Sequence, residues 1–322
     1  MITYPLLKSG ARIGVTASSS GVGPAYRTSF EQGCTRMGQR GYGVFCGDTV
    51  FHHSKTRSAS GKVRAAEFNS MMQDDSIDLI IPPWGGELLI EMLEHIDFSR
   101  IRDKWILGFS DISLLLLAVT LQTGLATAHG PGFGDISRDS VDEITGMWQT
   151  VMSTRPGGSV VQSSGPDEDE QKAWKSVSGA DTAVSGRLLG GCIDVIRHMI
   201  GTPYGDVGYY QQNMIGNEPV LWFLENCELR TADLPRSLVQ MKLAGWFEHC
   251  SGILFGRSPA NEPVDQYTIE DVYRELSEEL QVPIIYDIDC GHIPPQMTLV
   301  NGAYAEVKLT CGSGTITQYF RE

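Results

Sequence analysis

The sequence has few basic residues and no long hydrophobic run. Lysine and arginine number 25 against 39 aspartates and glutamates, which gives a formal net charge of −14. So acidic a chain repels polyphosphate, although one or two local arginines could still hold a small anionic substrate. The longest apolar stretch, Ile112–Leu121, is interrupted by Ser113 and Thr120 and is far shorter than the ~20 residues of a membrane helix. We therefore expect neither a nucleic-acid polymer nor a membrane as partner.

The chain also lacks the cysteine and histidine spacings of disulfide-rich and metal-binding proteins. Its 7 cysteines are scattered and include no C-x-x-C pair, which is typical of a reduced, cytoplasmic protein. No H-E-x-x-H spacing occurs, and the glycines of Ser20–Pro24 do not complete a dinucleotide-binding fingerprint. The N-terminal residues do not have the basic and apolar regions of a signal peptide. We expect no metal, no cofactor and a cytoplasmic location.

The length and the hydrophobic pattern predict two domains of the α/β class. At 35.3 kDa the chain exceeds what one hydrophobic core usually accommodates. Over residues 1–150, short apolar strands such as Ile77–Ile81 alternate with helical stretches, which predicts a parallel sheet covered by helices, flavodoxin-like or Rossmann-like. Residues 151–183 lack periodicity and are predicted to be a linker and a mobile substrate loop. Residues 184–322 are predicted to form a second α/β domain that is richer in strand.

Two turns of the first domain have residues suited to catalysis. Ser110 and Asp111 follow the predicted strand Trp105–Gly108 and precede a helix, and a serine at such a turn exposes its hydroxyl at the carboxyl end of the sheet. Gly85 and Gly86 follow the preceding strand and would let a backbone N–H approach a substrate oxygen. Each turn alone could equally be an ordinary helix cap or a tight connection. Together they open at the edge of a parallel sheet where ligands bind.

The second half of the chain supplies a candidate acid and a candidate base. Glu225 ends an apolar strand, where a carboxylate needs a partner, and His292 lies in a loop stiffened by glycine and proline. A serine nucleophile needs an imidazole to accept its proton and a carboxylate to orient that imidazole. His129, which follows a strand of the first half, competes for the role of base. From the residues alone, a structural role for each of them stays open.

Taken in order, these segments resemble the LD-carboxypeptidase family of serine peptidases, which includes the microcin C immunity proteins. The resemblance implies Ser110 as nucleophile, His292 as general base and Glu225 as the orienting carboxylate. It also implies that the backbone N–H groups of Gly86 and Asp111 form an oxyanion hole, and that His129 lies behind the site. It covers nearly the whole chain and rests on VTASSSG, IDLIIPPWGGELLIEMLEHIDFSRI, WILGFSDISLLL, AHGP, GRLLGGCIDVIRHMIGTPY, LWFLENCE, SGILFGR and DCGHIPPQMTLVNGA.

Within the family, the stretches EFNSMMQDDSIDLII and LLGGCIDVIRHMIGTPY resemble the immunity-protein branch, as does the loop ending at Trp174. Proteins of this branch hydrolyse the amide between a C-terminal acidic aminoacyl group and a modified nucleotide. The resemblance implies that Trp174 stacks on the nucleobase, an interaction worth about 1–3 kcal/mol, with a packed loop aromatic as the alternative. Gly85, Arg230 and Arg257 are further candidate substrate-binding residues, although either arginine could equally belong to an ion pair.

We therefore expect a cofactor-independent serine peptidase or amidase that acts on a small peptide or aminoacyl-nucleotide substrate and forms a homodimer. An LD-carboxypeptidase that releases terminal D-alanine from murein tetrapeptides is the alternative. A non-catalytic ligand-binding protein and a thiol enzyme using Cys290 or Cys227 are more distant rivals. Cys192 stands where relatives usually have asparagine, and Val300–Asn301 replaces a common Pro-Ile. Both departures concern substrate preference more than hydrolysis.

Overall fold

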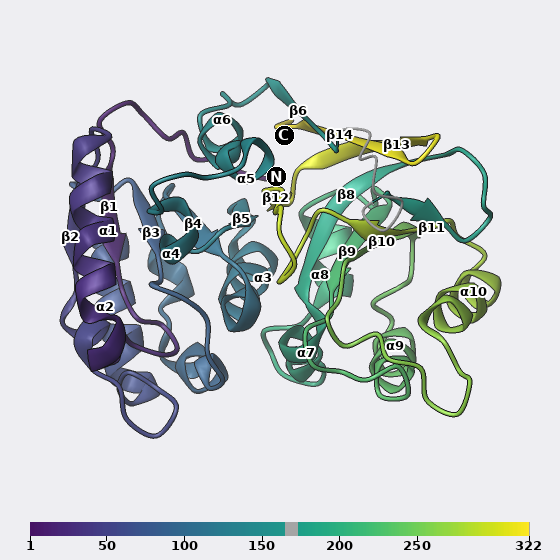
Figure 1. The fold of residues 1–322 in the computed structure, drawn as a ribbon, viewed down its shortest axis with the longest axis horizontal. Coiled ribbons are helices and arrows are strands. Elements are labelled where there is room, and N and C mark those ends of the chain that lie inside the picture. The colour runs from purple at the N-terminus through teal and green to yellow at the C-terminus, as the bar shows by residue number, and fades with distance from the viewer. Residues whose placement is uncertain (165–172, 322) are drawn as a thin grey trace.

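The computed structural model of the chain describes residues 1–164 and 173–321. Two sheets lie side by side, the first built mainly by the N-terminal half and the second by the C-terminal half (Figure 1). The predicted class, a parallel-sheet α/β unit followed by an α/β unit richer in strand, is confirmed. The predicted boundaries at residues 150 and 183 stay a prediction. The greater part of the predicted substrate loop, residues 165–172, lies outside the described residues.

The first sheet has six strands in the order β12-β5-β4-β3-β1-β2. Its strands β1 to β5 run parallel, and β12 from the C-terminal part of the chain pairs antiparallel with β5. The strands are β1 Arg12–Val15, β2 Gly43–Cys46, β3 Leu79–Ile81, β4 Trp105–Gly108, β5 Thr127–His129 and β12 Leu299–Asn301. The α-helices of this half are α1 Arg27–Gln39, α2 Gly61–Gln73, α3 Ser113–Thr123, α4 Phe133–Ile136, α5 Glu143–Gly146 and α6 Trp148–Met152. Short 3₁₀ helices are η1 Pro24–Tyr26, η2 Asp48–Phe51, η3 Leu89–His95, η4 Phe98–Arg100 and η5 Ser110–Ile112.

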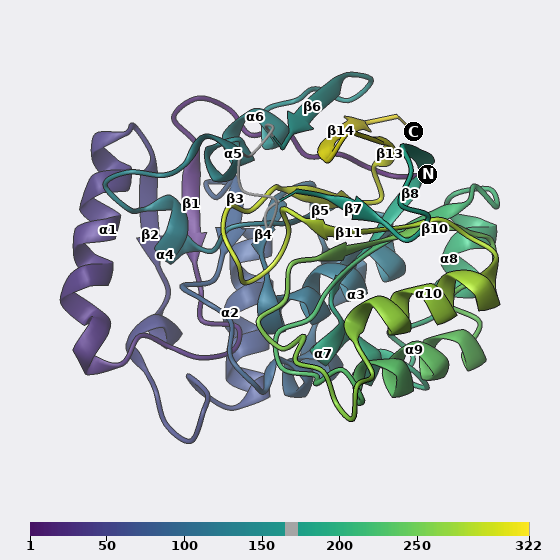
Figure 2. The same ribbon diagram turned by 45° about the vertical axis from the view of Figure 1, so that its right-hand side comes forward.

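The second sheet has eight strands in the order β6-β14-β13-β8-β9-β10-β11-β7. Its centre, β8 to β11, is parallel, whereas β13, β14, β6 and β7 pair antiparallel. Helices α9 and α10 lie next to each other along one face of this sheet (Figure 2). The strands are β6 Ser159–Ser163, β7 Lys175–Ser176, β8 Thr182–Cys192, β9 Val220–Glu225, β10 Cys250–Gly256, β11 Ile284–Ile288, β13 Tyr304–Thr310 and β14 Ser313–Tyr319. The helices are α7 Ile193–Ile196, η6 Arg197–Met199, α8 Val207–Asn213, α9 Leu234–Leu243 and α10 Ile269–Leu280.

Strands β6 and β7 fall within the segment that the sequence predicts to be a linker. Both are edge strands, and β6 alternates exposed and buried residues through Ser159-Val-Val-Gln-Ser163. Because this alternation covers only five residues, the sequence of β6 could not be distinguished from that of an irregular segment. The pairing with β14 makes it a strand.

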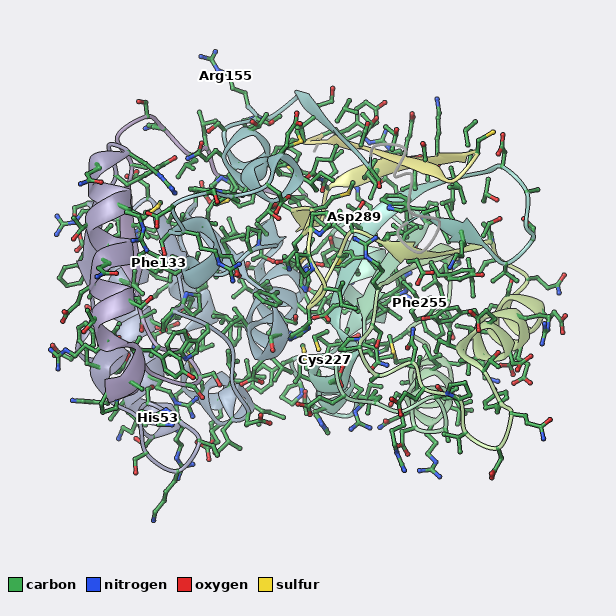
Figure 3. The ribbon with its side chains drawn as sticks, in the orientation of Figure 1. His53, Phe133, Arg155, Cys227, Phe255 and Asp289 are labelled. Carbon is green, nitrogen blue, oxygen red and sulfur yellow. The ribbon has the colours of Figure 1, made fainter. Side chains whose placement is uncertain are left out.

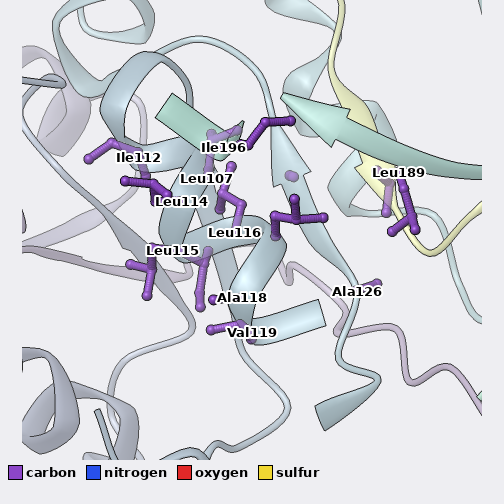
Figure 4. Packing of buried hydrophobic residues seen from close by; sticks show 14 of the residues in the cluster. Leu107, Ile112, Leu114, Leu115, Leu116, Ala118, Val119, Ala126, Leu189 and Ile196 are labelled. Carbon is purple, nitrogen blue, oxygen red and sulfur yellow. The ribbon is translucent and has the colours of Figure 1, made fainter. Parts of the chain in front are cut away.

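Helix α3 is the packed element between the two sheets. It is buried from Ser113 to Leu121 and contacts β4 and β5 of the first sheet as well as β8 of the second (Figure 4). Each fully buried leucine contributes about 1.5–3 kcal/mol, so this apolar helix is held firmly in place. Despite this composition, no helix within the described ranges is long and apolar enough to cross a bilayer.

Asn301 connects the two sheets through a single side chain. The backbone of Asn301 pairs with Thr127 where β12 lies beside β5 in the first sheet. The side-chain Oδ1 of Asn301 accepts a hydrogen bond from the N–H of Gly190 on β8 at 2.9 Å. The side chain is fully buried, so Gly190 has no water to replace this acceptor. The sequence position at which Asn301 departs from the common family pattern is therefore a structural contact between the halves.

We expect Asn301→Ala to lower the free energy of unfolding by about 1–3 kcal/mol, because it leaves the buried Gly190 N–H without an acceptor. The matched control is Asn213→Ala, since the exposed Asn213 side chain donates to the Tyr209 carbonyl at 2.9 Å and should cost less than about 0.5 kcal/mol. Urea unfolding of both variants measures the difference. Equal losses would contradict a connecting role for Asn301.

Candidate active site

Ser110 lies at a strained turn between β4 and α3. Its φ is +61°, a left-handed conformation that L-residues other than glycine rarely adopt. The turn touches the loop after β3, because a Cβ placed on Gly85 would lie 2.8 Å from Ser110 Cβ and 2.9 Å from Ser110 Oγ. Only glycine fits this approach. The structure thus brings together the two turns that the sequence singled out.

Two backbone N–H groups near Ser110 have the properties of an oxyanion hole. Among the residues that the structure describes, the amides of Gly86 and Asp111 donate no hydrogen bond. Gly86 has a φ of +149°, and a Cβ there would lie 2.4 Å from Ser19 Oγ, so this backbone also requires glycine. The Ser20 N–H donates to the Gly85 carbonyl at 3.2 Å and holds the loop in place. The two free donors are therefore part of a fixed backbone.

The carboxylate of Asp111 is buried and anchors the same turn. Its Oδ2 accepts the Leu89 N–H at 2.8 Å and the Ser19 hydroxyl at 2.5 Å. Burial raises the pKa of Asp111 above the usual aspartate range. Its Oδ1 has no hydrogen-bond partner within the described part of the chain.

Glu225 and His292 form a direct pair at the end of β9. Glu225 is fully buried, and its Oε2 lies 2.8 Å from Nδ1 of the half-buried His292. The His292 ring packs edge-on against Phe109, with ring centroids 5.0 Å apart, so the imidazole lies against the residue that precedes Ser110. A Cβ on Gly291 would lie 2.7 Å from Glu225 Oε2. The loop can approach the carboxylate only because this residue is glycine.

The electrostatics of the pair favour an ion pair. Burial alone would raise the pKa of Glu225, but the imidazoles of His129 and His292 lower it to about 2. Burial alone would lower the pKa of His292, but the Cys227 thiol and the Glu225 carboxylate raise it to about 10. The pair therefore stabilises the protonated imidazole, and the action of His292 as a base is expected to increase as the pH rises.

His129 is a second imidazole on the same carboxylate. It is fully buried, and its Nε2 lies 3.8 Å from Glu225 Oε1. The ring packs against Phe223 with centroids 5.4 Å apart. Because His129 has no exposed surface, it can act on a substrate only through Glu225, and this placement agrees with the position behind the site that the resemblance implies.

The cysteines near the site differ in their surroundings. Burial raises the pKa of both Cys290 and Cys192 well above the thiol range, which disfavours the thiolate that a cysteine nucleophile needs. Cys192 donates from its backbone N–H to Ser113 Oγ at 3.0 Å and lies beside Glu225 in the β8–β9 pair. Cys227 is half-buried and raises the pKa of His292. The sequence offered no signal for this influence.

The structure contradicts the prediction that Trp174 stacks on a nucleobase. Its ring is 1% exposed and lies in the core of the second sheet, where a Cβ on Gly314 would be 1.9 Å from it. Its indole N–H donates to Asp289 Oδ2 at 3.0 Å. Asp289, labelled near the middle of the molecule in Figure 3, also forms an ion pair with Arg257. Trp174 is therefore a core residue that orients a buried ion pair.

Both candidate substrate-binding arginines form ion pairs within the protein. Arg257 is buried, pairs with Asp289 and donates to the Asp287 carbonyl at 3.0 Å. The side chain of Arg230 is 72% exposed and pairs with Asp233 at 2.9 Å. Both guanidinium groups are thus directed to carboxylates of the protein itself, which leaves the predicted substrate contacts without support.

Two hollows adjoin the Ser110 turn. One of about 160 Å³ is lined by Phe109, Gly291 and His292 together with the segment from Asp135 to Thr145. A larger hollow, of about 440 Å³, is lined by residues that include Asp111, Glu87 and Glu228. Neither glutamate was singled out from the sequence, although Glu87 directly follows Gly86 and Glu228 ends the segment LWFLENCE. Within residues 1–164 and 173–321 there is no group of three or more potential metal ligands.

Comparison with known proteins gives one consistent family. Residues 13–130 match the family model of the LD-carboxypeptidase N-terminal domain, and residues 185–307 match that of the C-terminal domain. The chain is 24% identical over 345 residues to the microcin C7 self-immunity protein MccF of Escherichia coli, covering 99% of this chain and 97% of that protein. It is 25% identical over 305 residues to a Bacillus subtilis protein named as a probable murein peptide carboxypeptidase, covering 93% and 89%.

Solved structures share the fold over the whole chain. An MccF-like protein from Bacillus anthracis superimposes with a TM-score of 0.83 at 21% identity, covering 99% of both chains. MccF in complex with glutamyl sulfamoyl guanosine superimposes with a TM-score of 0.82 at 20% identity, covering 100% of both. These matches show that the chain shares the fold of these proteins, and they do not determine its substrate.

We expect Gly291→Ala to slow the reaction of Ser110 with a fluorophosphonate, which labels activated serines, by about tenfold or more. The added Cβ displaces Glu225 or His292, and a misplacement of about 1 Å can cost ~100-fold in rate. Gly201→Ala is the control, because Gly201 also has a positive φ (+83°) but no atom within 4 Å of the added Cβ. Mass spectrometry of Ser110 measures both rates. Equal slowing in the two variants would show that backbone strain alone is responsible.

We expect Cys227→Ala to shift the pH profile of Ser110 labelling to lower pH. Cys227 raises the pKa of His292, so its removal leaves more neutral imidazole at pH 7, and a shift of half a pH unit corresponds to about a threefold gain. The exposed Cys311, changed to alanine, is the control and should leave the profile where it is in the wild type. An unshifted Cys227→Ala profile contradicts the influence of Cys227 on the His292 pKa, and complete loss of labelling favours a direct thiol role.

Proposed function

The chain belongs to the LD-carboxypeptidase family of serine peptidases, and from this premise we propose that Ser110, His292 and Glu225 form the catalytic triad of a carboxypeptidase-type hydrolase. The observation that carries the proposal is the 2.8 Å contact between His292 Nδ1 and the buried Glu225 carboxylate. The packing of His292 against Phe109 supports it, since Ser110 is the next residue. These contacts support a triad in which Ser110 comes from the first half of the chain and His292 and Glu225 come from the second.

The proposed reaction follows from the contacts of each group. With Nδ1 held by Glu225, Nε2 of His292 accepts the proton of Ser110 as Oγ attacks the amide carbonyl. The N–H groups of Gly86 and Asp111 then stabilise the oxyanion, and one such donor is typically worth roughly 3–4 kcal/mol. His292 returns the proton to the leaving amine, which departs, and a water activated by His292 hydrolyses the acyl-enzyme.

The substrate that we propose is an amide that joins a C-terminal acidic aminoacyl group to a modified nucleotide. Support comes from relatives: MccF structures hold glutamyl sulfamoyl guanosine and aspartyl sulfamoyl adenosine, and they match the fold over the whole chain. The burial of Trp174 removes one contact through which a nucleobase would be held. A murein peptide with a terminal D-alanine is the second candidate, supported by the name of the Bacillus subtilis relative.

A cytoplasmic location and a homodimer are also proposals that follow from family membership. The scattered, unpaired cysteines support the first, since Cys34, Cys46, Cys192, Cys227, Cys250, Cys290 and Cys311 are all free thiols.

We expect wild-type protein to cleave aspartyl sulfamoyl adenosine, and Ser110→Ala to lose at least about 10³-fold in rate. A murein tetrapeptide is assayed beside it by mass spectrometry. Ser99→Ala is the control, because Ser99 is an exposed serine whose hydroxyl only donates to Asp97. Cleavage of the tetrapeptide alone would favour the second substrate. Undiminished cleavage by Ser110→Ala would overturn the triad, and a biological effect that survives in a cleavage-deficient Ser110→Ala protein would favour a binding protein.

A further inference from the structure

The larger hollow beside Ser110 lies on the acyl side of the proposed site. In triad hydrolysis the base protonates the leaving amine, so the leaving group lies against the histidine. His292 lines only the smaller hollow, with Phe109 and Gly291. The larger one, of about 440 Å³, is instead lined by Asp111 and Glu87, which directly follow the nucleophile and the candidate oxyanion donor Gly86. A group placed there belongs to the part of the substrate that acylates Ser110.

The walls of this hollow have an excess of negative charge. Four carboxylates, those of Glu87, Asp111, Asp194 and Glu228, face one guanidinium, that of Arg197. His198 adds no positive charge at neutral pH, because burial lowers its pKa below the usual histidine range. A second carboxylate on a substrate would therefore be repelled here, whereas a cation would be attracted.

Two of the four carboxylates and the one cation already have partners. Asp194 accepts the backbone N–H groups of Cys227, Glu228 and Leu229 at 2.8–3.1 Å. Arg197 donates from Nε to the Asp194 carbonyl at 3.1 Å and from Nη1 to the Ser237 hydroxyl at 3.3 Å. Asp111 is held through Oδ2 alone.

The other groups remain available to a ligand. The side chains of Glu87 and Glu228 are exposed and, within the described part of the chain, form no hydrogen bond or ion pair. Asp111 is 1% exposed, lines the hollow and has an Oδ1 without a partner. Burial and the nearby charges of Glu228 and Asp111 raise the pKa of Glu87, which shows that these carboxylates repel one another. The buried Oδ1 of Asp111 is the acceptor that lacks a partner, and the two exposed carboxylates beside it favour a donor with positive charge.

We propose that this hollow binds a free ammonium group on the acyl part of the substrate, through the carboxylates of Glu87 and Glu228 and Oδ1 of Asp111. The inference rests on the proposed function, because it assigns the acyl side from the role of His292. The acyl group is then an aminoacyl residue whose amine is not blocked. An acidic side chain, if the substrate has one, lies outside this hollow.

The test uses diphenyl phosphonate analogues of alanine, with the amine either free or acetylated. Ser110 Oγ attacks phosphorus, a P–O bond to Ser110 forms, and phenol leaves with the proton that His292 accepted. For each probe, the labelling rate of Ser110 is divided by the rate at which that probe hydrolyses in buffer. This ratio corrects for the difference in intrinsic reactivity between the free and the acetylated probe. We expect the free amine to label about tenfold faster, which corresponds to one charge-assisted contact.

The variants Glu87→Gln and Glu228→Gln should each reduce this preference to about threefold or less. Glu94→Gln is the matched control, since the Glu94 side chain is 73% exposed and has only His95 near it, and it should keep the full preference. Equal labelling by the two probes, or an undiminished preference in both variants, overturns the inference. Failure of a fluorophosphonate to label Ser110 in the wild type would instead overturn the proposed function.

Discussion

The site is organised around one buried carboxylate. Glu225 has no exposed surface, and a charge in that position is stable only if it is paired and hydrogen-bonded. Its two oxygens face two imidazoles, with His292 at 2.8 Å and His129 at 3.8 Å. The backbone around it is glycine, because a Cβ on Gly291 or Gly256 would lie within 3.2 Å of the Glu225 side chain. The position of His292, and hence of the base, follows from these constraints.

The turn that carries Ser110 and the loop that carries His292 are held together because the two halves of the chain share a core. Helix α3 begins after Ser110 and packs against strands of both sheets, so the turn cannot move independently of β8 and β9. Strand β12 crosses from the C-terminal half to pair with β5, which ends at His129. Its last residue, Asn301, accepts the Gly190 N–H from the second sheet. The proposed triad is divided between the two halves, so its geometry depends on contacts far from its own side chains.

The burial of Trp174 and the charges around the larger hollow restrict the range of candidate substrates more than family membership does. Trp174, which the resemblance assigned to a nucleobase, instead packs in the second sheet and orients the Asp289–Arg257 pair. The largest hollow at the site is lined by Glu87 and Glu228. MccF structures with this fold hold aminoacyl nucleotides. The ligand of this chain depends instead on the residues that line its own hollow. An ammonium group is the ligand feature that its charges favour.

Much of the architecture could be read from the sequence, because alternating strands and helices predict a parallel sheet and glycine-rich turns after strands mark one of its edges. The proposed triad did not follow from the local pattern alone; it followed from the resemblance to a known family, which implies Ser110, Glu225 and His292. The tertiary structure alone decided which side chains are exposed. Trp174 is buried because Gly314 leaves room for its ring. The influence of Cys227 on the pKa of His292, and of Glu228 on that of Glu87, connects segments far apart in the chain. The sequence determines the chemical type and the local structure of each residue, whereas tertiary packing determines its burial and the residues that lie next to it.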